Sequence, residues 1–201
     1  MLRVQPALIS MANNPLSFGR SGSGLPAIQN APAADVLEIC FGAKSDGPTA
    51  TEKKFMRRAV EVSKQSKDPS SKVGVVITGV GRHSRTVLSE GYNHFPTGID
   101  EGPAERWERP AKYDWIGHGE TNAIGEAARK GAALDGARIY LNWFPCINCA
   151  KTVIASGIKE LVAFTPDYEH ERWGNDFKFV KKMLDEAGIQ LRLFSEEQFM
   201  S

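Results

Sequence analysis

The apolar and polar positions of this chain become regular from residue 49 onward. Between residue 49 and about residue 66, apolar side chains recur at the spacing of an amphipathic helix. They are Phe55, Met56, Ala59 and Val62. Thr49 and Glu52 are spaced as in a capping box just before this pattern, so we expect the helix to begin there.

Short apolar runs alternate with helical patterns along the rest of the chain. We expect strands over residues 73–78, 86–92, 138–143, 161–164 and 189–193. Helices are expected over residues 121–130, 145–157 and 176–187, each of which ends at a glycine or just before one. A turn through Gly79 and Gly81 joins the first two strands. This alternation predicts an α/β domain with a mainly parallel sheet and helices on both of its faces.

The first 48 residues differ from the remainder. They contain prolines at positions 6, 15, 26, 32 and 48 and a glycine- and serine-rich run over residues 19–24, without a sustained apolar period. We therefore expect a flexible N-terminal extension over residues 1–48 and one folded domain over residues 49–201. The alternative for the extension is an organellar transit peptide, because residues 1–34 hold Arg3 and Arg20 but no acidic residue.

Composition and charge narrow the class of protein. The 201 residues include 25 basic and 24 acidic ones, for a formal charge of +1, so there is no broad basic field of the kind that binds polymeric nucleic acid. No run approaches the roughly 18 apolar residues that span a bilayer. We expect a protein without membrane or nucleic-acid partners that acts on a small molecule. The three cysteines favour a reducing compartment and hence the cytoplasm.

Two short motifs point to a metal site. His118-Gly119-Glu120 and Pro145-Cys146-Ile147-Asn148-Cys149 match the H-x-E and P-C-x-x-C signature of zinc-dependent base deaminases. One imidazole and two thiolates give Zn²⁺ three protein ligands and leave a position for water, as in catalytic zinc sites. Pro145 suits the first position of a helix, which places both cysteines in its first turn, where the helix dipole favours the thiolate. Glu120 is then the proton carrier.

Other interpretations of these motifs are a redox dithiol and a structural zinc site. A site with four cysteines is impossible within one chain, because Cys40 is the only other cysteine. The redox interpretation leaves His118 and Glu120 without a role.

Four blocks of sequence resemble the deoxycytidylate (dCMP) deaminases of the zinc-dependent cytidine deaminase superfamily. They are residues 66–74, residues 91–98, residues 112–115 leading into His118, and residues 149–151 with 156–158. The resemblance implies a three-layer fold with a five-stranded mixed sheet flanked by helices, and homo-oligomers that are commonly hexamers. It also implies the hydrolysis of dCMP to dUMP, which supplies thymidylate synthesis.

The resemblance implies a set of substrate contacts besides the zinc ligands and Glu120. They are Asn93, Gly119, Tyr168, Ser66, Lys67 and Ser71. Asn93 matches an asparagine that binds the sugar, Tyr168 a tyrosine near the nucleotide, and the three loop residues a phosphate loop. The alternatives are a turn residue after a strand for Asn93, a surface tyrosine for Tyr168 and a plain turn for the loop.

The chain also departs from the family pattern. Gly119 replaces the usual alanine, which should leave the chemistry intact, and His94 stands where relatives often carry a small residue, so that it either alters substrate choice or faces solvent. No cysteine or histidine lies between residues 95 and 117, so a second zinc is not supported. Control by the effectors dCTP and dTTP, which the family shows, cannot be assumed.

Two further functions compete with dCMP deamination. One is deamination of another nucleoside, nucleotide or base, such as cytidine, guanine or tRNA adenosine, although the near-zero net charge counts against tRNA. The other is a zinc scaffold without activity, for which an intact Glu120 would be needless.

Overall fold

The computed structural model describes residues 47–201. A flexible extension was predicted over residues 1–48, with a transit peptide as the alternative. Residues 1–46 of that stretch lie outside the described residues. Among the described residues, no helix is both long and apolar enough to cross a membrane.

The described chain alternates between helices and strands from its start. The helices are α2 (Ala50–Ser63), α3 (Lys112–Trp115), α4 (Gly119–Arg129), α5 (Ile147–Ala155), α6 (Gly174–Glu186) and α7 (Glu196–Met200). The strands are β1 (Gly74–Thr78), β2 (Val87–Tyr92), β3 (Arg138–Leu141), β4 (Glu160–Phe164) and β5 (Gln190–Phe194). Two short 3₁₀ turns, η1 (Gly81–His83) and η2 (Ala104–Trp107), lie in the connections before β2 and before α3.

The five strands form one mixed sheet in the order β2-β1-β3-β4-β5. The β3–β4 and β4–β5 pairs are parallel, whereas β1 is antiparallel to both β2 and β3. The expectation of a mainly parallel sheet is therefore wrong for half of the pairings. A short turn joins β1 to β2 as a hairpin, which forces an antiparallel pair, and β1 then lies between two strands that run the same way.

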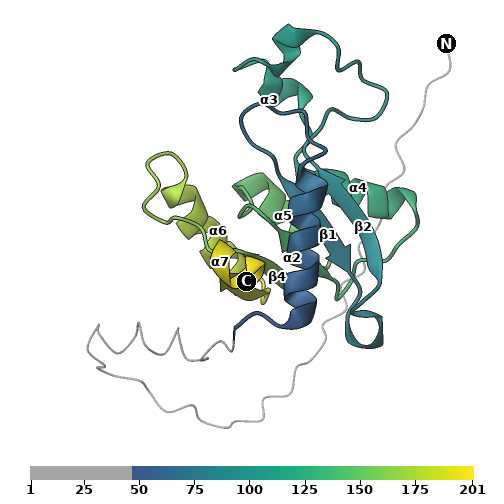
Figure 1. The fold of residues 1–201 in the computed structure, drawn as a ribbon, viewed down its shortest axis with the longest axis vertical. Helices are drawn as coiled ribbons and strands as arrows, with labels where there is room; N and C mark the ends of the chain where they lie inside the picture. The colour runs from purple at the N-terminus through teal and green to yellow at the C-terminus, as the bar shows by residue number, and fades with distance from the viewer. Residues whose placement is uncertain (1–46) are drawn as a thin grey trace, which may run out of the picture. The chain divides into compact units, whose positions relative to one another are not determined.

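Helices cover both faces of the sheet, so the domain has the three layers that the resemblance implies (Figure 1). On one face α2 and α7 pack over a cluster that includes Phe55, Met56, Tyr140 and Phe199. On the other face α4, α5 and α6 enclose a larger apolar cluster, to which β1 contributes Val75 and Ile77.

The capping box at the start of α2 is confirmed. The Thr49 hydroxyl accepts a hydrogen bond from the Glu52 backbone at 3.2 Å, and the Thr49 backbone donates to the Glu52 carboxylate at 2.8 Å. The helix ends at Ser63 rather than near residue 66. The next residues turn away because the Ser66 hydroxyl binds the Asn93 carbonyl at 2.8 Å, and because Asp68 precedes a proline.

A glycine in the edge strand β2 allows α4 to approach the sheet closely. A Cβ atom at Gly91 would lie 2.5 Å from the Ala123 nitrogen and 2.7 Å from the Gly119 oxygen. Only a residue without a side chain fits between strand and helix there. Gly91 therefore sets the position of the N-terminal turn of α4, which carries the H-x-E motif.

Candidate metal and catalytic site

The two motifs meet because two helices begin at the same end of the sheet. His118 is the N-cap of α4, and Cys146 is the N-cap of α5. Pro145 was expected at the first helical position, but it precedes the N-cap, since Cys146 has an extended backbone with ψ 169° and α5 begins at Ile147. Cys149 is still in the first turn, so the predicted convergence of two helix starts is found.

The donor atoms of His118, Cys146 and Cys149 all lie within 4.8 Å of one another. The Nδ1 atom of His118 is 3.5 Å from Cys146 Sγ and 3.3 Å from Cys149 Sγ. A tetrahedral zinc ion, with bonds of about 2.0 Å to nitrogen and 2.3 Å to sulfur, separates such ligands by roughly 3.6 Å. The three side chains therefore form a His/Cys/Cys triad with the chemistry and spacing that zinc requires, and no other such group of potential ligands occurs in residues 47–201.

Contacts among these three side chains change their pKa values. Hydrogen bonds from Cys149 and His118 lower the pKa of Cys146 to about 4, despite its partial burial. The same bond to Cys146, together with burial, raises the pKa of Cys149. The bond to Cys146 also raises the pKa of His118. Zinc binds cysteine as the thiolate, so binding of the ion displaces any proton that these thiols hold.

Glu120 lies beside the triad and is only 3% exposed. Burial raises the pKa of its carboxyl group above the usual value. A carboxyl group with a raised pKa can both accept and release a proton under ordinary conditions, as general acid–base catalysis requires.

Glu120 and two of the triad residues line a pocket of about 120 Å³. The lining residues are Asp68, Ser71, Val73, Asn93, Arg109, Lys112, Tyr113, Ile116, His118, Gly119, Glu120, Trp143, Cys146, Trp173 and Phe177. Ser71, Asn93 and Gly119, which were expected to contact the substrate, are thus brought together with Glu120. Gly119 is the first residue of α4, so its N–H has no acceptor within the helix.

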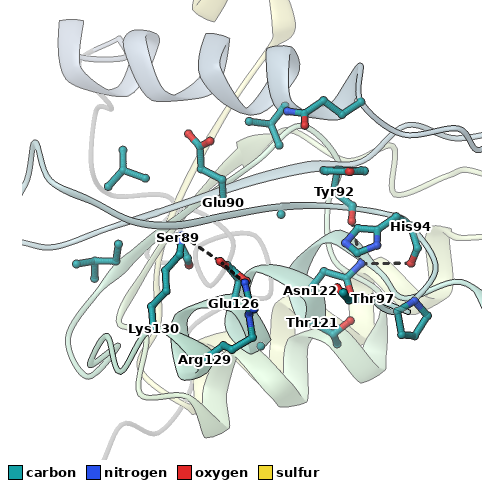
Figure 2. A pocket seen from close by; sticks show the side chains of 17 residues that line it. Ser89, Glu90, Tyr92, His94, Thr97, Thr121, Asn122, Glu126, Arg129 and Lys130 are labelled. Carbon is teal, nitrogen blue, oxygen red and sulfur yellow. Dashed lines mark hydrogen bonds and ion pairs between the residues drawn. The ribbon is translucent and has the colours of Figure 1, made fainter. Parts of the chain in front are cut away.

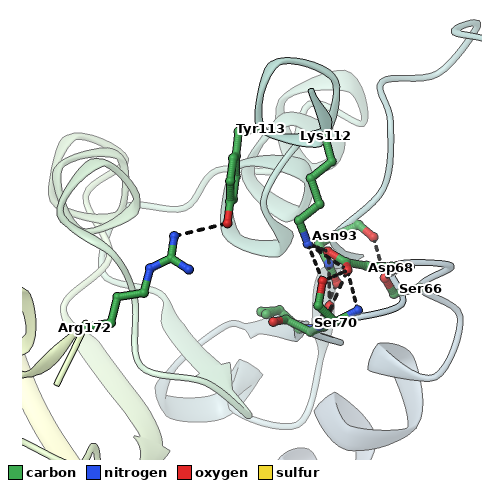
Figure 3. A network of polar contacts seen from close by, with 9 residues as sticks. Ser66, Asp68, Ser70, Asn93, Lys112, Tyr113 and Arg172 are labelled. Atoms are coloured by element: carbon green, nitrogen blue, oxygen red, sulfur yellow. Dashed lines mark hydrogen bonds and ion pairs between the residues drawn. The ribbon is translucent and has the colours of Figure 1, made fainter. Parts of the chain in front are cut away.

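The side chain of Asn93 is held in one orientation (Figure 3). Its Nδ2 atom donates to Asp68 Oδ2 at 3.2 Å and to the Ser71 carbonyl at 2.8 Å. Its Oδ1 atom accepts from the Val73 nitrogen at 2.8 Å. Both amide hydrogens are used, and one acceptor lone pair is left. Asn93 can therefore accept a hydrogen bond from a ligand hydroxyl but has no hydrogen left to donate.

The other three expected contacts do not line this pocket. Lys67 is 69% exposed, and its Nζ atom pairs with Glu101 at 2.8 Å. Ser66 is buried, and its hydroxyl is bonded to backbone groups of the same turn and of Asn93. Tyr168 packs against the large apolar cluster, and its hydroxyl is buried without a hydrogen-bond partner in the described part of the chain.

The sequence did not single out several residues of the pocket, among them the buried Lys112. The Lys112 ammonium binds both carboxylate oxygens of Asp68, at 2.9 and 2.8 Å, and the Ser70 hydroxyl at 2.8 Å (Figure 3). Both members of this ion pair are only 4% exposed. The one indication in the sequence was that Lys112 is the first residue of the block 112–115, which resembles the dCMP deaminases.

A second pocket, of about 570 Å³, lies between the edge strand β2 and α4 (Figure 2). It is larger, but none of the triad residues lines it. His94 lines this second pocket, with its ring 4.7 Å from that of Tyr92, and does not line the triad pocket. The Asn122 amide donates to the carbonyls of Tyr92 and His94, at 2.9 and 3.4 Å, and ties the end of β2 to α4.

Comparison with known proteins identifies relatives that match about 70% of the chain. Residues 49–165 match the model of the cytidine and deoxycytidylate deaminase zinc-binding region. The chain is 37% identical over 142 residues to an uncharacterized deaminase in the luxG 3′ region of Aliivibrio fischeri, covering 69% of this chain and 90% of the relative. It is 32% identical to the deoxycytidylate deaminase of Homo sapiens, covering 70% and 77%.

A solved structure shares the fold. The dCMP deaminase of the cyanophage S-TIM5, determined in complex with dCMP and dUMP, superposes with a TM-score of 0.55 at 21% identity, covering 71% of this chain and 96% of that one. The predicted cytidine-deaminase-like fold is thereby confirmed.

Proposed function

Since the chain belongs to the cytidine and deoxycytidylate deaminase family and is a zinc-dependent deaminase, we propose that its domain of residues 49–201 hydrolyses dCMP to dUMP and ammonia. The observation that carries this proposal is the buried Glu120, which shares a pocket with His118 and Cys146. The choice of dCMP is supported by relatives from several animals and two phages that are named deoxycytidylate deaminase or probable deoxycytidylate deaminase, at 30 to 32% identity.

The residues of the triad would hold the metal, and the pocket residues would handle the substrate. Bound zinc supplies a nucleophile near neutral pH, because it lowers the pKa of water to about 7. The Gly119 N–H is available to the ring carbonyl, and Asn93 accepts a hydrogen bond from a sugar hydroxyl.

Glu120 moves the protons of the reaction. It takes one proton from the attacking water and delivers it to N3 of the cytosine ring while the water oxygen bonds to C4. It then carries the second proton of that water to the amino group. The C4–N bond breaks, ammonia leaves with that proton, and C4 becomes the carbonyl carbon of uracil. No proton needs to be exchanged with solvent, which suits a carboxyl group that is 3% exposed.

The test is ammonia release from a panel of cytosine, guanine and adenine nucleotides, nucleosides and bases, with wild-type protein and Glu120→Gln. The amide cannot accept the water proton, so we expect it to lower kcat by about 10² to 10⁴-fold. Zinc content should stay unchanged in that variant, which controls for damage to the triad. A preference of the wild type for a base other than cytosine would refute the dCMP assignment. Turnover by Glu120→Gln above about a tenth of the wild-type rate would refute the proton-carrier role.

A further inference from the structure

Two arginines lie close to Tyr113, an exposed residue that lines the triad pocket. From their geometry we infer that Arg109, Tyr113 and Arg172 form the binding site for the phosphate group of a nucleoside monophosphate. This inference rests on the proposed function and names the part of the protein that would select a nucleotide over a nucleoside. It differs from the loop of Ser66, Lys67 and Ser71 that the resemblance implied, of which only Ser71 lines the pocket.

The three side chains come from two separate segments. Arg109 and Tyr113 belong to the connection between β2 and α4, and both line the pocket that contains Glu120. Arg172 lies just before α6, and its guanidinium donates to the Tyr113 hydroxyl at 3.1 Å (Figure 3). The guanidinium carbons of Arg109 and Arg172 lie 5.9 and 6.0 Å from the centre of the Tyr113 ring. Trp173, the neighbour of Arg172, lines the same pocket.

Neither arginine is neutralised by a neighbouring acid. In residues 47–201, no carboxylate lies within 4.0 Å of Arg109 or Arg172. The hydrogen bond from Arg172 and the charges of Arg109 and Lys112 lower the pKa of Tyr113, because these positive groups surround its hydroxyl. By contrast Lys112 is paired with Asp68, and Lys67 with Glu101.

This arrangement suits a phosphate dianion. A guanidinium offers parallel N–H donors that match two phosphate oxygens, and a phenol adds a third donor. The buried Lys112–Asp68 pair fixes the turn of α3 that carries Tyr113, so that little ordering is needed on binding. A nucleoside offers these donors only a neutral hydroxyl and no anionic group, and the site should therefore discriminate by phosphorylation state.

The test compares kcat/KM for dCMP and deoxycytidine in the wild type, Arg109→Gln and Arg172→Gln. Loss of one charge-assisted hydrogen bond should lower kcat/KM for dCMP by about 10- to 100-fold. Activity on deoxycytidine should change far less, because the nucleoside lacks the dianion that the two arginines would bind. Arg129→Gln, an exposed arginine on α4 away from the pocket, is the charge-matched control and should leave both substrates unaffected.

Lys67→Gln represents the competing phosphate loop. Lys67→Gln could lower activity on dCMP selectively, while both arginine variants prefer dCMP over deoxycytidine as strongly as the wild type does. In that case the inferred site is wrong and dCMP deamination still stands. An equal loss on both substrates in the arginine variants would likewise overturn the site, since it would indicate general damage to the pocket.

A binding measurement keeps the site testable without turnover. In calorimetric titrations the wild type should bind dUMP at least about ten-fold more tightly than deoxyuridine, and each arginine variant should lose most of that preference. If the wild type shows this preference but deaminates a different base, the proposed function fails and the phosphate site survives. If it binds dUMP and deoxyuridine equally, the phosphate site is refuted.

Discussion

Replacing Lys112 with methionine removes one partner of a buried ion pair and should strongly destabilise the domain. Lys112 and Asp68 are each 4% exposed, and the ammonium binds both carboxylate oxygens and the Ser70 hydroxyl. Methionine has a similar length but no charge, so Asp68 would be left as a buried carboxylate with only backbone, hydroxyl and amide donors.

The expected cost follows from that burial. Breaking a buried ion pair by removal of one partner typically costs about 3 to 5 kcal/mol, because the remaining charge stays desolvated. For a domain of this size each kcal/mol lowers Tm by about 2 to 4 °C, so the expected fall is about 6 to 20 °C. The control is Lys64→Met, whose ion pair with Glu61 has partners that are 66% and 58% exposed, and which should lower Tm by less than about 2 °C.

Thermal and urea unfolding of the zinc-loaded protein would measure this effect, and a double-mutant cycle would assign it to the pair. Asp68→Asn should also be strongly destabilising, but in combination with Lys112→Met the two losses should fall short of additivity by about 2 kcal/mol or more. Additive losses, or a cost of Lys112→Met below about 1 kcal/mol, would show that the two charges do not depend on each other and would refute the reasoning.

Three further outcomes are expected. Metal analysis should find roughly one zinc per chain in the wild type. Cys149→Ala should lose most of this zinc, because the two remaining ligands do not hold the ion firmly, whereas the control Cys40→Ala should keep it. Gly91→Ala should cost about 1 to 3 kcal/mol in denaturant unfolding, because its Cβ would lie 2.5 Å from the Ala123 backbone, whereas Gly125→Ala, whose Cβ meets nothing within 4 Å, should be neutral or stabilising. Unfolding at several pH values should show a contribution from Asp68 that is complete above about pH 5 and is lost as the pH falls further.

The sign of the pH effect follows from the native contacts of Asp68. Burial alone would raise its pKa, but hydrogen bonds from Lys112 and Ser70 more than offset this, and the pKa is lowered in the folded protein. A carboxyl group whose pKa is lowered in the folded state stabilises that state at pH values above the pKa of the group in the unfolded chain. Acid must therefore weaken this stabilisation. An acid-unfolding profile of Asp68→Asn that matches the wild type would contradict this assignment. Full zinc occupancy in Cys149→Ala would contradict the predicted role of Cys149 as a ligand. Unchanged stability in Gly91→Ala would contradict the predicted steric conflict with α4.

Features that depend on neighbouring residues were open to prediction from the sequence. The capping box of Thr49 and Glu52 is made within one helical turn, and the expected position of each strand overlaps the observed one. The metal triad was predictable for a related reason. His118 and the two cysteines lie at the starts of helices, where the spacing along the chain decides which side chains share a face. A set of one histidine and two cysteines is in turn a typical ligand set for zinc.

Contacts between distant segments were decided only by the tertiary structure. The sequence shows two strands joined by a turn, but the insertion of β1 between β2 and β3 depends on how the α4 crossover returns to the sheet. Lys67 and Asp68 are neighbours in the chain, yet one pairs with Glu101 at the surface and the other with Lys112 in the interior. No periodic pattern governs a loop, so which of its side chains turns inward depends on the partners that the fold supplies. The same holds for Arg172 and Tyr113, which meet although 59 positions separate them.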